Sequence, residues 1–457
     1  MSEIKGESLS EGIAMGRICF YSDNIVDVAR YETDDAEREF ERYIKALETA
    51  KSRLQKLYDY VKENIGEDES VIFQTHIMIL EDSQFRKKVE NNIKNCKMNA
   101  EFAVYDAALK IGELFKQIDD EYLKQRYCDI IDSANTMLEI LDPQTKDLGD
   151  DTYSVIAAKW ILPSETVKFR KNNFCGFVTN QGSRNCHSAI LARSMELPAV
   201  TGIKGDLSEF NGVYTIIDGY QGKIIIEPDD ATIAAYEKLR ADKEMLKEKA
   251  LKAVELLEKE YPEALCSLEY TDPLQLLIAT RLAAQCTDER VNKVTPALFE
   301  RYKNVHDFAA ADVDEVGKYI YSCGFYKTKS RDIVAMCQML IDEYNGTVPD
   351  TVEKLTRLPG IGRKTANLIV GDIYGKPAVV VDTHCIRITG RLGLHKIKDA
   401  AKIETILRGL LPPEKSNNFC HRLVLHGRAV CNSRKPKCSE CCLKDICDYY
   451  ASTAHES

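Results

Sequence analysis

The pattern of hydrophobic residues changes twice along the chain, and this change most constrains the fold. Over 34–143, hydrophobic residues recur every three or four positions between charged ones, which predicts amphipathic helices. From 153 to 226 the chain carries short runs rich in β-branched residues, such as Val213–Ile217, which predict strands. Beyond Thr271 the helical pattern returns, in segments separated by Gly, Pro and Asn. The sequence therefore predicts a multidomain protein.

The strand-like run Arg17–Tyr21 precedes the first helical region. We expect it to join the later strands in one α/β domain, with the helices inserted as a bundle. The Lys- and Glu-rich stretch that follows is typical of an exposed connecting helix. The predicted organisation is an α/β domain over 1–30 and 145–230, an inserted helical bundle over 31–144, a helical linker over 231–250, and an all-α domain over 251–457.

The charge of the chain argues against nucleic-acid binding only when it is averaged. The 457 residues have a net charge of −10, whereas phosphate binding needs clustered Lys and Arg. Within 351–450, however, 18 basic residues face 9 acidic ones. A basic region therefore lies within an acidic protein.

Three features predict a cytoplasmic location. The first residues contain no basic stretch followed by an apolar one, so they do not resemble a signal peptide. No apolar run approaches the ~18–20 residues that a membrane span needs. Of the 16 cysteines, those outside the C-terminal stretch are scattered singly, as in proteins from reducing compartments.

The last cysteines form the run Cys431-x6-Cys438-x2-Cys441-x5-Cys447, set among basic residues. Four thiolates at such short spacing predict a metal centre, and both zinc and a 4Fe-4S cluster accept this ligand set. Cys442 sits beside Cys441 and is predicted to be a bystander, with an exchange of ligands left open.

The segment Leu358–Ala366 (LPGIGRKTA) lies between two helical patterns. Gly360 and Gly362 allow a tight turn that presents backbone N–H groups at a helix N-terminus, where a DNA phosphate can bind without sequence readout. Arg363 and Lys364 follow directly, and Lys364 is equally well read as one more phosphate contact or as an amine nucleophile. Asp382, in VVDTH, is equally well read as a helix N-cap or as a carboxylate that guides protons.

From Thr271 to Tyr450 the chain resembles the endonuclease III family. The motifs LPGIGRKTAN, VDTH, LHGR and the cysteine run match that family in order and spacing, as do AAQCTD, GFYKTKS and NGTVP. The resemblance implies an all-α helix-hairpin-helix DNA glycosylase with a C-terminal 4Fe-4S cluster loop. Such an enzyme flips an oxidised pyrimidine out of double-stranded DNA, excises it and cuts the strand at the abasic site.

The resemblance also implies residue roles. Lys364 would be the nucleophile that forms a Schiff base and leads to β-elimination, with Asp382 stabilising positive charge and handling protons. Gln285 would fill the gap left by the flipped base, and Phe325 would be an apolar wedge. Without the resemblance, Gln285 reads as an ordinary polar helix residue and Phe325 as a core residue. The cluster ligands would be the four cysteines of the run, which would hold the basic loop around Lys435 against DNA.

A second candidate site lies in the N-terminal half, in the run from Gly182 to Arg193 (GSRNCHSAILAR). His187 stands at the predicted start of a helix, after a Gly-containing loop. A helix N-terminus stabilises a phosphoryl group and favours the neutral imidazole nucleophile. The alternative is a histidine at an ordinary surface position.

Residues 4–240 resemble the N-terminal region of enzyme I of the bacterial sugar phosphotransferase system, through SEGIAMG, HIMILED, LPSET and the His187 segment. The resemblance implies that His187 is phosphorylated and that the bundle docks a phosphocarrier protein. Gly182-Ser183, Asn185-Cys186 and Leu162 depart from the family pattern. The barrel that binds phosphoenolpyruvate in that family is replaced here by the glycosylase-like half. A phosphoryl-relay or carrier-binding module is therefore the alternative function, and a joining of two separate reading frames is an alternative origin.

Overall fold

The computed structural model describes residues 1–21, 28–116, 121–142 and 154–453. The chain divides into two compact units, Met1–Arg240 and Ala241–Ser457, and each is described by itself. The predicted domain boundary at 144/145 lies outside the described residues.

The first unit is built on an eight-stranded mixed sheet with the order β1-β8-β7-β3-β4-β5-β6-β2. The central strands β3, β4, β5 and β6 are parallel neighbours, and the outer pairs are antiparallel. The sequence did not predict the two short, polar edge strands β1 and β2. The strands are β1 Ser2–Lys5, β2 Glu7–Ser10, β3 Ile13–Tyr21, β4 Ser154–Ala158, β5 Gly176–Thr179, β6 Ala199–Thr201, β7 Tyr214–Asp218 and β8 Lys223–Ile226.

Alternate residues of the strands bury opposite faces of this sheet, as the pleat requires. Ile156 and Phe177 pack with the helices α6 (Pro163–Lys171) and α7 (His187–Ser194), while Val155 faces the other side with Leu207 of the 3₁₀ turn Leu207–Phe210. The sequence therefore predicted the central strands and α7 correctly, because their periodicity follows from burial.

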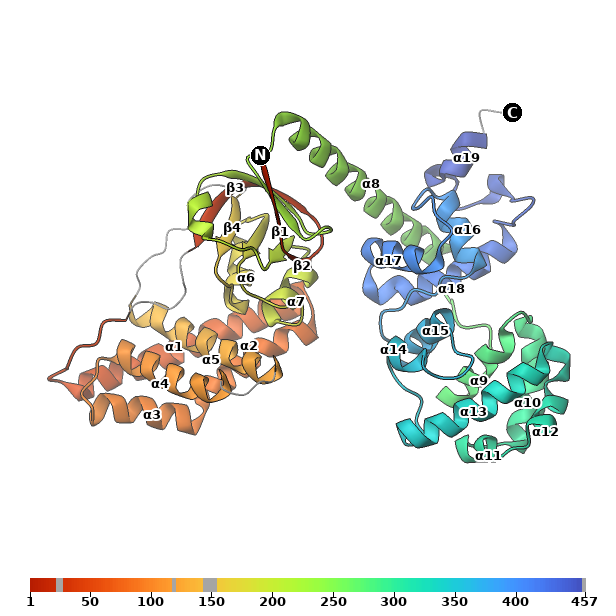
Figure 1. Ribbon diagram of the computed structural model, residues 1–457, viewed down its shortest axis with the longest axis horizontal. Coiled ribbons are helices and arrows are strands. Elements are labelled where there is room, and N and C mark those ends of the chain that lie inside the picture. Colours follow the sequence, from red (N-terminus) through yellow and green to blue (C-terminus); the bar gives the residue numbers. More distant parts are fainter. Residues whose placement is uncertain (22–27, 117–120, 143–153, 454–457) are drawn as a thin grey trace. The chain divides into compact units, whose positions relative to one another are not determined.

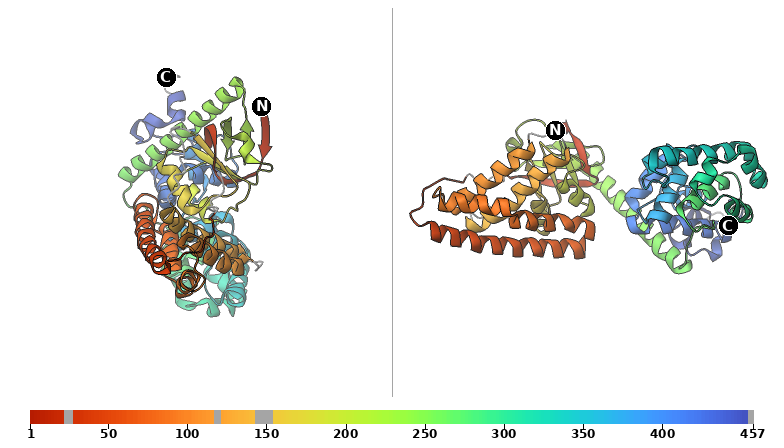
Figure 2. Two further views of the ribbon diagram at one scale, coloured as in Figure 1. Left: turned by 90° about the vertical axis from the view of Figure 1, so that its left-hand side faces the viewer. Right: turned by 90° about the horizontal axis from the view of Figure 1, so that it is seen from below.

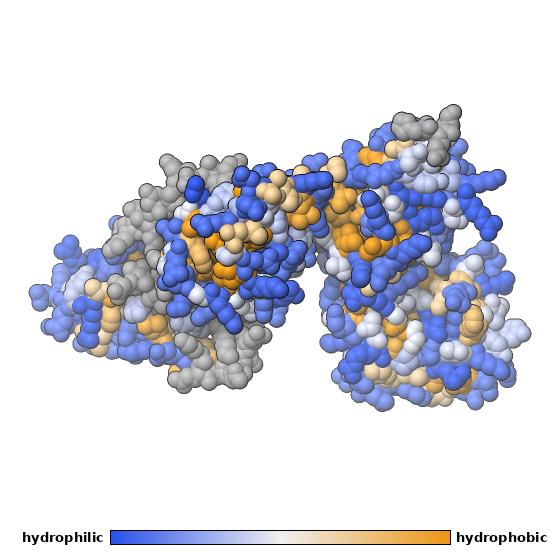
Figure 3. Space-filling view, turned by 45° about the horizontal axis from the view of Figure 1, so that its top comes forward, coloured by the Kyte–Doolittle hydropathy of each residue, from blue (hydrophilic) through white to orange (hydrophobic). Residues whose placement is uncertain are grey.

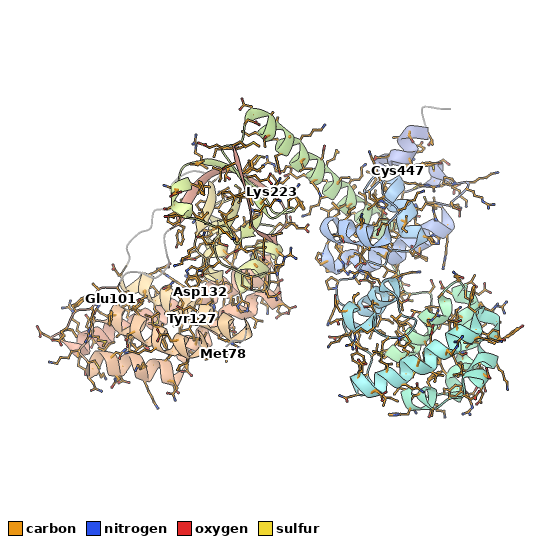
Figure 4. The ribbon with its side chains drawn as sticks, in the orientation of Figure 1. Met78, Glu101, Tyr127, Asp132, Lys223 and Cys447 are labelled. Carbon is orange, nitrogen blue, oxygen red and sulfur yellow. The ribbon has the colours of Figure 1, made fainter. Side chains whose placement is uncertain are left out.

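The helical bundle is inserted between β3 and β4, as the sequence predicted (Figure 1). Its core is lined with small and apolar side chains such as Ala50, Leu54 and Phe73. Asp132 of the bundle is labelled in Figure 4. It accepts hydrogen bonds from the Ser164 backbone and hydroxyl, which joins the bundle to α6. The helices are α1 Ala36–Asn64, α2 Glu67–Glu81, α3 Ser83–Lys94, α4 Ala100–Lys116 and α5 Glu121–Leu141.

A single helix, α8 (Asp230–Glu260), contains the predicted linker. The division between the two units falls between Arg240 and Ala241, inside this helix. Its C-terminal part buries Ala253 and Leu257 in the core of the second unit. The exact domain boundaries stay a prediction.

The second unit is all-helical, as Figure 2 also shows. It has two hydrophobic cores, one around Leu276 and Ile333 and one around Ile403 and Phe419. Its helices are α9 Pro273–Ala283, α10 Asp288–Arg301, α11 Val305–Ala309, α12 Val313–Tyr319, α13 Tyr326–Tyr344, α14 Val352–Leu355, α15 Arg363–Tyr374, α16 Thr383–Arg391, α17 Ala400–Leu410, α18 Pro413–Ala429 and α19 Asp448–Thr453.

The surface is mostly hydrophilic on the face drawn in Figure 3, with hydrophobic side chains in smaller areas between polar ones. Among the described helices, none combines the length and hydrophobicity needed to cross a membrane.

Candidate functional site

Lys364, Asp382 and Gln285 line one open cavity in the second unit. Lys364 comes from α15, Asp382 precedes α16, and Gln285 lies in the turn between α9 and α10. The cavity has both polar and apolar walls, which include Leu268, Leu368 and His421. The fold thus brings three predicted site residues from separate segments to one concave surface, as small-molecule or base binding requires.

Lys364 is the second residue of α15 and is exposed. Among the described residues it has no hydrogen-bond or ion-pair partner. Its neighbour Arg363 is different, because Glu404 accepts two hydrogen bonds from the Arg363 guanidinium at 2.7 and 2.9 Å. Arg363 is therefore held against the fold, while the Lys364 amine is left for a ligand.

The turn before α15 has the geometry that its glycines predict. Gly360 has φ +74°, and a Cβ there would come within 2.4 Å of Arg281 Nε and 2.7 Å of Asp332 Oδ2. Gly362 is the N-cap of α15 and has open space around it. The hairpin therefore packs closely on one side and leaves the N-terminus of α15 open on the other, which suits a phosphate.

Asp382 is the N-cap of α16, since its Oδ1 accepts a hydrogen bond from the Cys385 N–H at 2.7 Å. Its Oδ2 has no hydrogen-bond partner among the residues described, and the side chain lines the cavity. The structural and the catalytic interpretations of this residue are thus compatible. Burial lowers the pKa of the neighbouring His384, and cations that include Lys364 lower it further, while Asp382 opposes them.

Gln285 and Phe325 share an unusual backbone conformation. Gln285 has φ +55° and Phe325 has φ +46°, and both side chains are exposed. Phe325 is 68% exposed, so it is not the core residue that its hydrophobicity alone would suggest. Gln285 lies in a turn and not in a helix. Non-glycine residues in this region cost about 1 kcal/mol or more and concentrate at functional sites.

The four cysteines of the C-terminal run line a separate small cavity, and Cys442 does not line it. In the described part of the chain, no three His, Cys, Asp or Glu side chains gather closely enough for one metal ion. A single zinc ion would draw its thiolates to about 2.3 Å, whereas a 4Fe-4S core spreads its ligands over four irons. Four thiols that line one cavity are a donor set that either group accepts. Figure 4 labels Cys447.

Arg391 organises the loop that carries these cysteines. Its guanidinium donates to Cys431 Sγ at 3.1 Å, to the Asn432 carbonyl at 2.8 Å and to the Ser433 carbonyl at 3.0 Å. Lys435 lies farther along this loop and is exposed. A donor at a ligand sulfur is typical of the surroundings of a metal centre.

In the first unit, His187 begins α7 and its Nδ1 lies 3.0 Å from Asp129 Oδ1. Although burial opposes it, the hydrogen bond to His187 and the charge of the nearby His76 hold the pKa of Asp129 at about 2. His187 lines a cavity together with Arg126 and other residues of the bundle. His187 therefore lies at a concave surface between α7 and the bundle.

Comparison with known proteins identifies both halves. Residues 278–413 match the HhH-GPD superfamily of base excision DNA repair proteins. Residues 5–126 match the N-terminal region of PEP-utilising enzymes, and residues 151–222 match the mobile domain of PEP-utilising enzymes.

Endonuclease III of Synechocystis sp. is 47% identical over 202 residues, which are 44% of this chain and 92% of that protein. The chain belongs to the endonuclease III family. Endonuclease III of Bacillus subtilis is 40% identical over 188 residues, which are 41% of this chain and 86% of that protein. The chain is thus an endonuclease III-like DNA glycosylase/AP lyase whose family region is fused to enzyme I-like N-terminal and mobile domains.

Two solved structures are similar to separate halves of the chain. The protein chain in a structure of a non-covalent endonuclease III–DNA complex is 40% identical to this protein. The match covers 46% of this chain and 98% of the chain in the complex, with a TM-score of 0.44. A solution structure of an N-terminal enzyme I protein is 31% identical and covers 53% of this chain and 99% of that one, also with a TM-score of 0.44.

Several polar residues around the endonuclease III-like site were missed in the sequence analysis, and each acts through a contact that no local spacing signals. Glu404 holds Arg363 from α17, and Arg391 reaches the cysteine loop from α16. Lys329 is buried beneath the turns that carry Gln285 and Phe325. The motif GFYKTKS contains Lys329, but nothing in the sequence of this motif distinguishes the buried Lys329 from the exposed Lys327.

Proposed function

We propose that this protein excises oxidised pyrimidines from double-stranded DNA and cleaves the resulting abasic site by β-elimination through Lys364. The observation that carries the proposal is the shared cavity of Lys364, Asp382 and Gln285. An amine that no carboxylate holds can reach the reacting carbon, whereas a lysine held in an ion pair is poorly placed for this step.

In the proposed reaction, the neutral Nζ of Lys364 attacks C1′ of the damaged nucleotide, and the bond from C1′ to the base breaks. The base leaves with the electron pair and takes up a proton. The C1′–O4′ bond then breaks, O4′ takes up a proton, and Nζ becomes a protonated Schiff base with C1′. Loss of a C2′ proton follows, and the C3′–O bond breaks, so that the downstream strand leaves with a 5′-phosphate. Water finally hydrolyses the Schiff base and regenerates the Lys364 amine. Asp382 stabilises the positive charge that develops at C1′ and takes up and returns protons. It does so through Oδ2, because Oδ1 accepts the hydrogen bond that caps α16.

The remaining proposed roles concern binding. Gln285 fills the space left by the flipped base, and Phe325 acts as a wedge between bases. Gly360, Gly362, Arg363 and Lys435 contact the DNA backbone, with Arg363 aligned by Glu404. Such contacts position the duplex without selecting a sequence.

A 4Fe-4S cluster is the proposed cofactor, with Cys431, Cys438, Cys441 and Cys447 as its ligands. The cluster would cross-link the loop that carries these four cysteines, and it would take no part in excision of the base. Arg391 holds the loop backbone on one side, so the exposed Lys435 is presented at a fixed place.

Borohydride trapping tests this function and the role of Asp382 together. The protein is expected to form a covalent adduct with duplex DNA that contains one abasic site, because reduction fixes the Schiff base. Asp382→Asn should slow the adduct about 10²–10⁴-fold, since a general acid–base contributes this much. Asparagine still accepts the Cys385 N–H, so the melting temperature should stay unchanged. If Asp382→Asn forms the adduct at the unmodified rate, the role of Asp382 is limited to capping α16. If the unmodified protein forms no adduct, the proposed lyase activity is refuted.

A second candidate function, phosphoryl exchange at His187, is favoured by one observation. The contact between Nδ1 and Asp129 fixes the imidazole ring, which makes Nε2 the nitrogen for phosphorylation at the cavity. The adjacent bundle would then dock the phosphocarrier protein that donates the group.

Incubation with a phosphorylated carrier protein of the sugar phosphotransferase type tests this candidate. We expect acid-labile label on the protein and none on His187→Ala, while His306→Ala, an exposed histidine of the other unit, keeps the label. Absence of label from the unmodified protein would reduce the first unit to a binding module or scaffold.

A further inference from the structure

Two turns of the second unit present the proposed DNA-inserting side chains, and both turns begin where a helix ends. Leu282 lies in the last turn of α9, and Gln285 follows it three residues later. Phe325 comes two residues after Cys323, the last residue of the 3₁₀ helix Tyr321–Cys323. The last carbonyls of a helix lack partners within that helix.

Lys329 supplies the missing partner to both helix ends. It lies in the first turns of α13 and is only 1% exposed. Its Nζ donates to the Leu282 carbonyl at 2.8 Å and to the Cys323 carbonyl at 2.9 Å. A cation at a helix C-terminus is also favoured by the helix dipole. One ammonium group therefore ties together the two segments that lead into Gln285 and Phe325.

The surroundings of Lys329 make this tie rigid. Arg281, beside Leu282 on α9, is paired with Asp332 of α13 at 2.9 Å, and Gly360 of the hairpin packs against that ion pair. If the buried ammonium lost these two carbonyls, the ammonium and both carbonyls would be left without hydrogen-bond partners, which is unfavourable away from water. The two turns thus have little freedom to move independently of each other.

We propose that Lys329 is a positioning residue that couples the two turns, so that Gln285 and Phe325 enter the DNA duplex as one unit during base flipping. The inference rests on the proposed roles of these two side chains. Both hold left-handed backbone conformations, which need support from their surroundings to persist. If Lys329 only stabilised the core, its replacement would slow base excision and abasic-site cleavage alike. If it couples the two turns, its replacement slows mainly the step in which the base is flipped out of the duplex.

The test compares two substrates of the full-length protein. Lys329→Met should slow single-turnover excision of an oxidised pyrimidine about 10–100-fold, because small misplacement of a positioning group has effects of this size. Cleavage at a preformed abasic site should fall about threefold or less, since no stacked base has to be flipped out there. Lys318→Met, which removes an exposed lysine of α12, is the matched control and should change neither rate. Equal losses on both substrates would overturn the proposal.

A double-mutant cycle keeps the proposal testable if Lys329→Met does not fold. Gln285→Ala and Phe325→Ala change exposed side chains, so both variants should keep the melting temperature of the unmodified protein. We expect their losses of excision rate to be non-additive in the presence of Lys329, with the double variant about as slow as the worse single one. Strictly additive losses would refute the coupling.

The same variants separate this inference from the proposed function. Their affinity for duplex DNA that contains a non-hydrolysable analogue of the damaged nucleotide requires no chemistry and reports base flipping with insertion of the two side chains. If the unmodified protein fails to form the borohydride adduct but non-additivity persists in this binding assay, the lyase proposal fails and the coupling stands. If the adduct forms and the binding losses add, the coupling fails and the lyase stands.

Discussion

Lys364→Ala is expected to abolish the borohydride-trapped adduct with abasic DNA and to lower strand cleavage by at least about 10³-fold, because no other group then supplies the amine that carries the bond. The Lys364 side chain is exposed and lacks an ion pair among the described residues, so its removal should leave the melting temperature unchanged. Single-turnover cleavage and gel detection of the adduct measure the two effects.

Two further variants sharpen this experiment. Lys364→Arg keeps the positive charge but cannot act as an amine nucleophile, so it should bind the duplex and still form no adduct. Lys376→Ala, just after α15, removes a lysine that is paired with Asp350 and should trap normally. Persistent trapping by Lys364→Ala would assign the nucleophile to another amine.

Cys438→Ser is expected to remove the visible absorbance of an iron–sulfur cluster and to destabilise the second unit. A metal centre of this kind contributes folding free energy of its own. For a unit of this size, each 1 kcal/mol that is lost lowers the melting temperature by roughly 2–4 °C. Absorption spectra, iron analysis and thermal unfolding of the second unit measure these effects.

Cys442→Ser is the matched control, because it changes the adjacent thiol that does not line the cluster cavity. It should keep both the absorbance and the melting temperature. Loss of absorbance in Cys442→Ser with retention in Cys441→Ser would show that the ligands are exchanged. A colourless unmodified protein that contains zinc would overturn the cluster assignment.

Much of the fold was predictable because burial sets the periodicity. The core strands around Ile156 and Phe177 are buried on both faces and appear in the sequence as short apolar runs. The amphipathic helix α1 instead buries one regular set of residues, which the sequence displays as a helical period. The edge strands β1 and β2 were missed because each spans only four residues and is mostly polar. Their pairing with β8 and β6 depends on segments that lie far away in the sequence.

The candidate site in the second unit likewise has features that the sequence predicts and features that it does not. The sequence correctly identified the turn at Gly360 and the N-cap candidate Asp382, because these depend on neighbouring residues. It assigned Phe325 to the core on hydrophobicity alone, and only the resemblance to endonuclease III suggested a wedge. The exposed, left-handed backbone of Phe325 agrees with the second interpretation.

The sequence by itself determined the local chemistry of this protein: four thiols within one short loop, a glycine turn before Lys364 and a histidine at the start of α7. These features depend on distances along the chain, which covalent geometry fixes. Only the tertiary structure decided that Lys364, Asp382 and Gln285 share a cavity, that Asp129 orients His187, and that Lys329 joins two turns. Such contacts arise from the packing of whole helices, and a buried charge acquires its partners only when those helices meet.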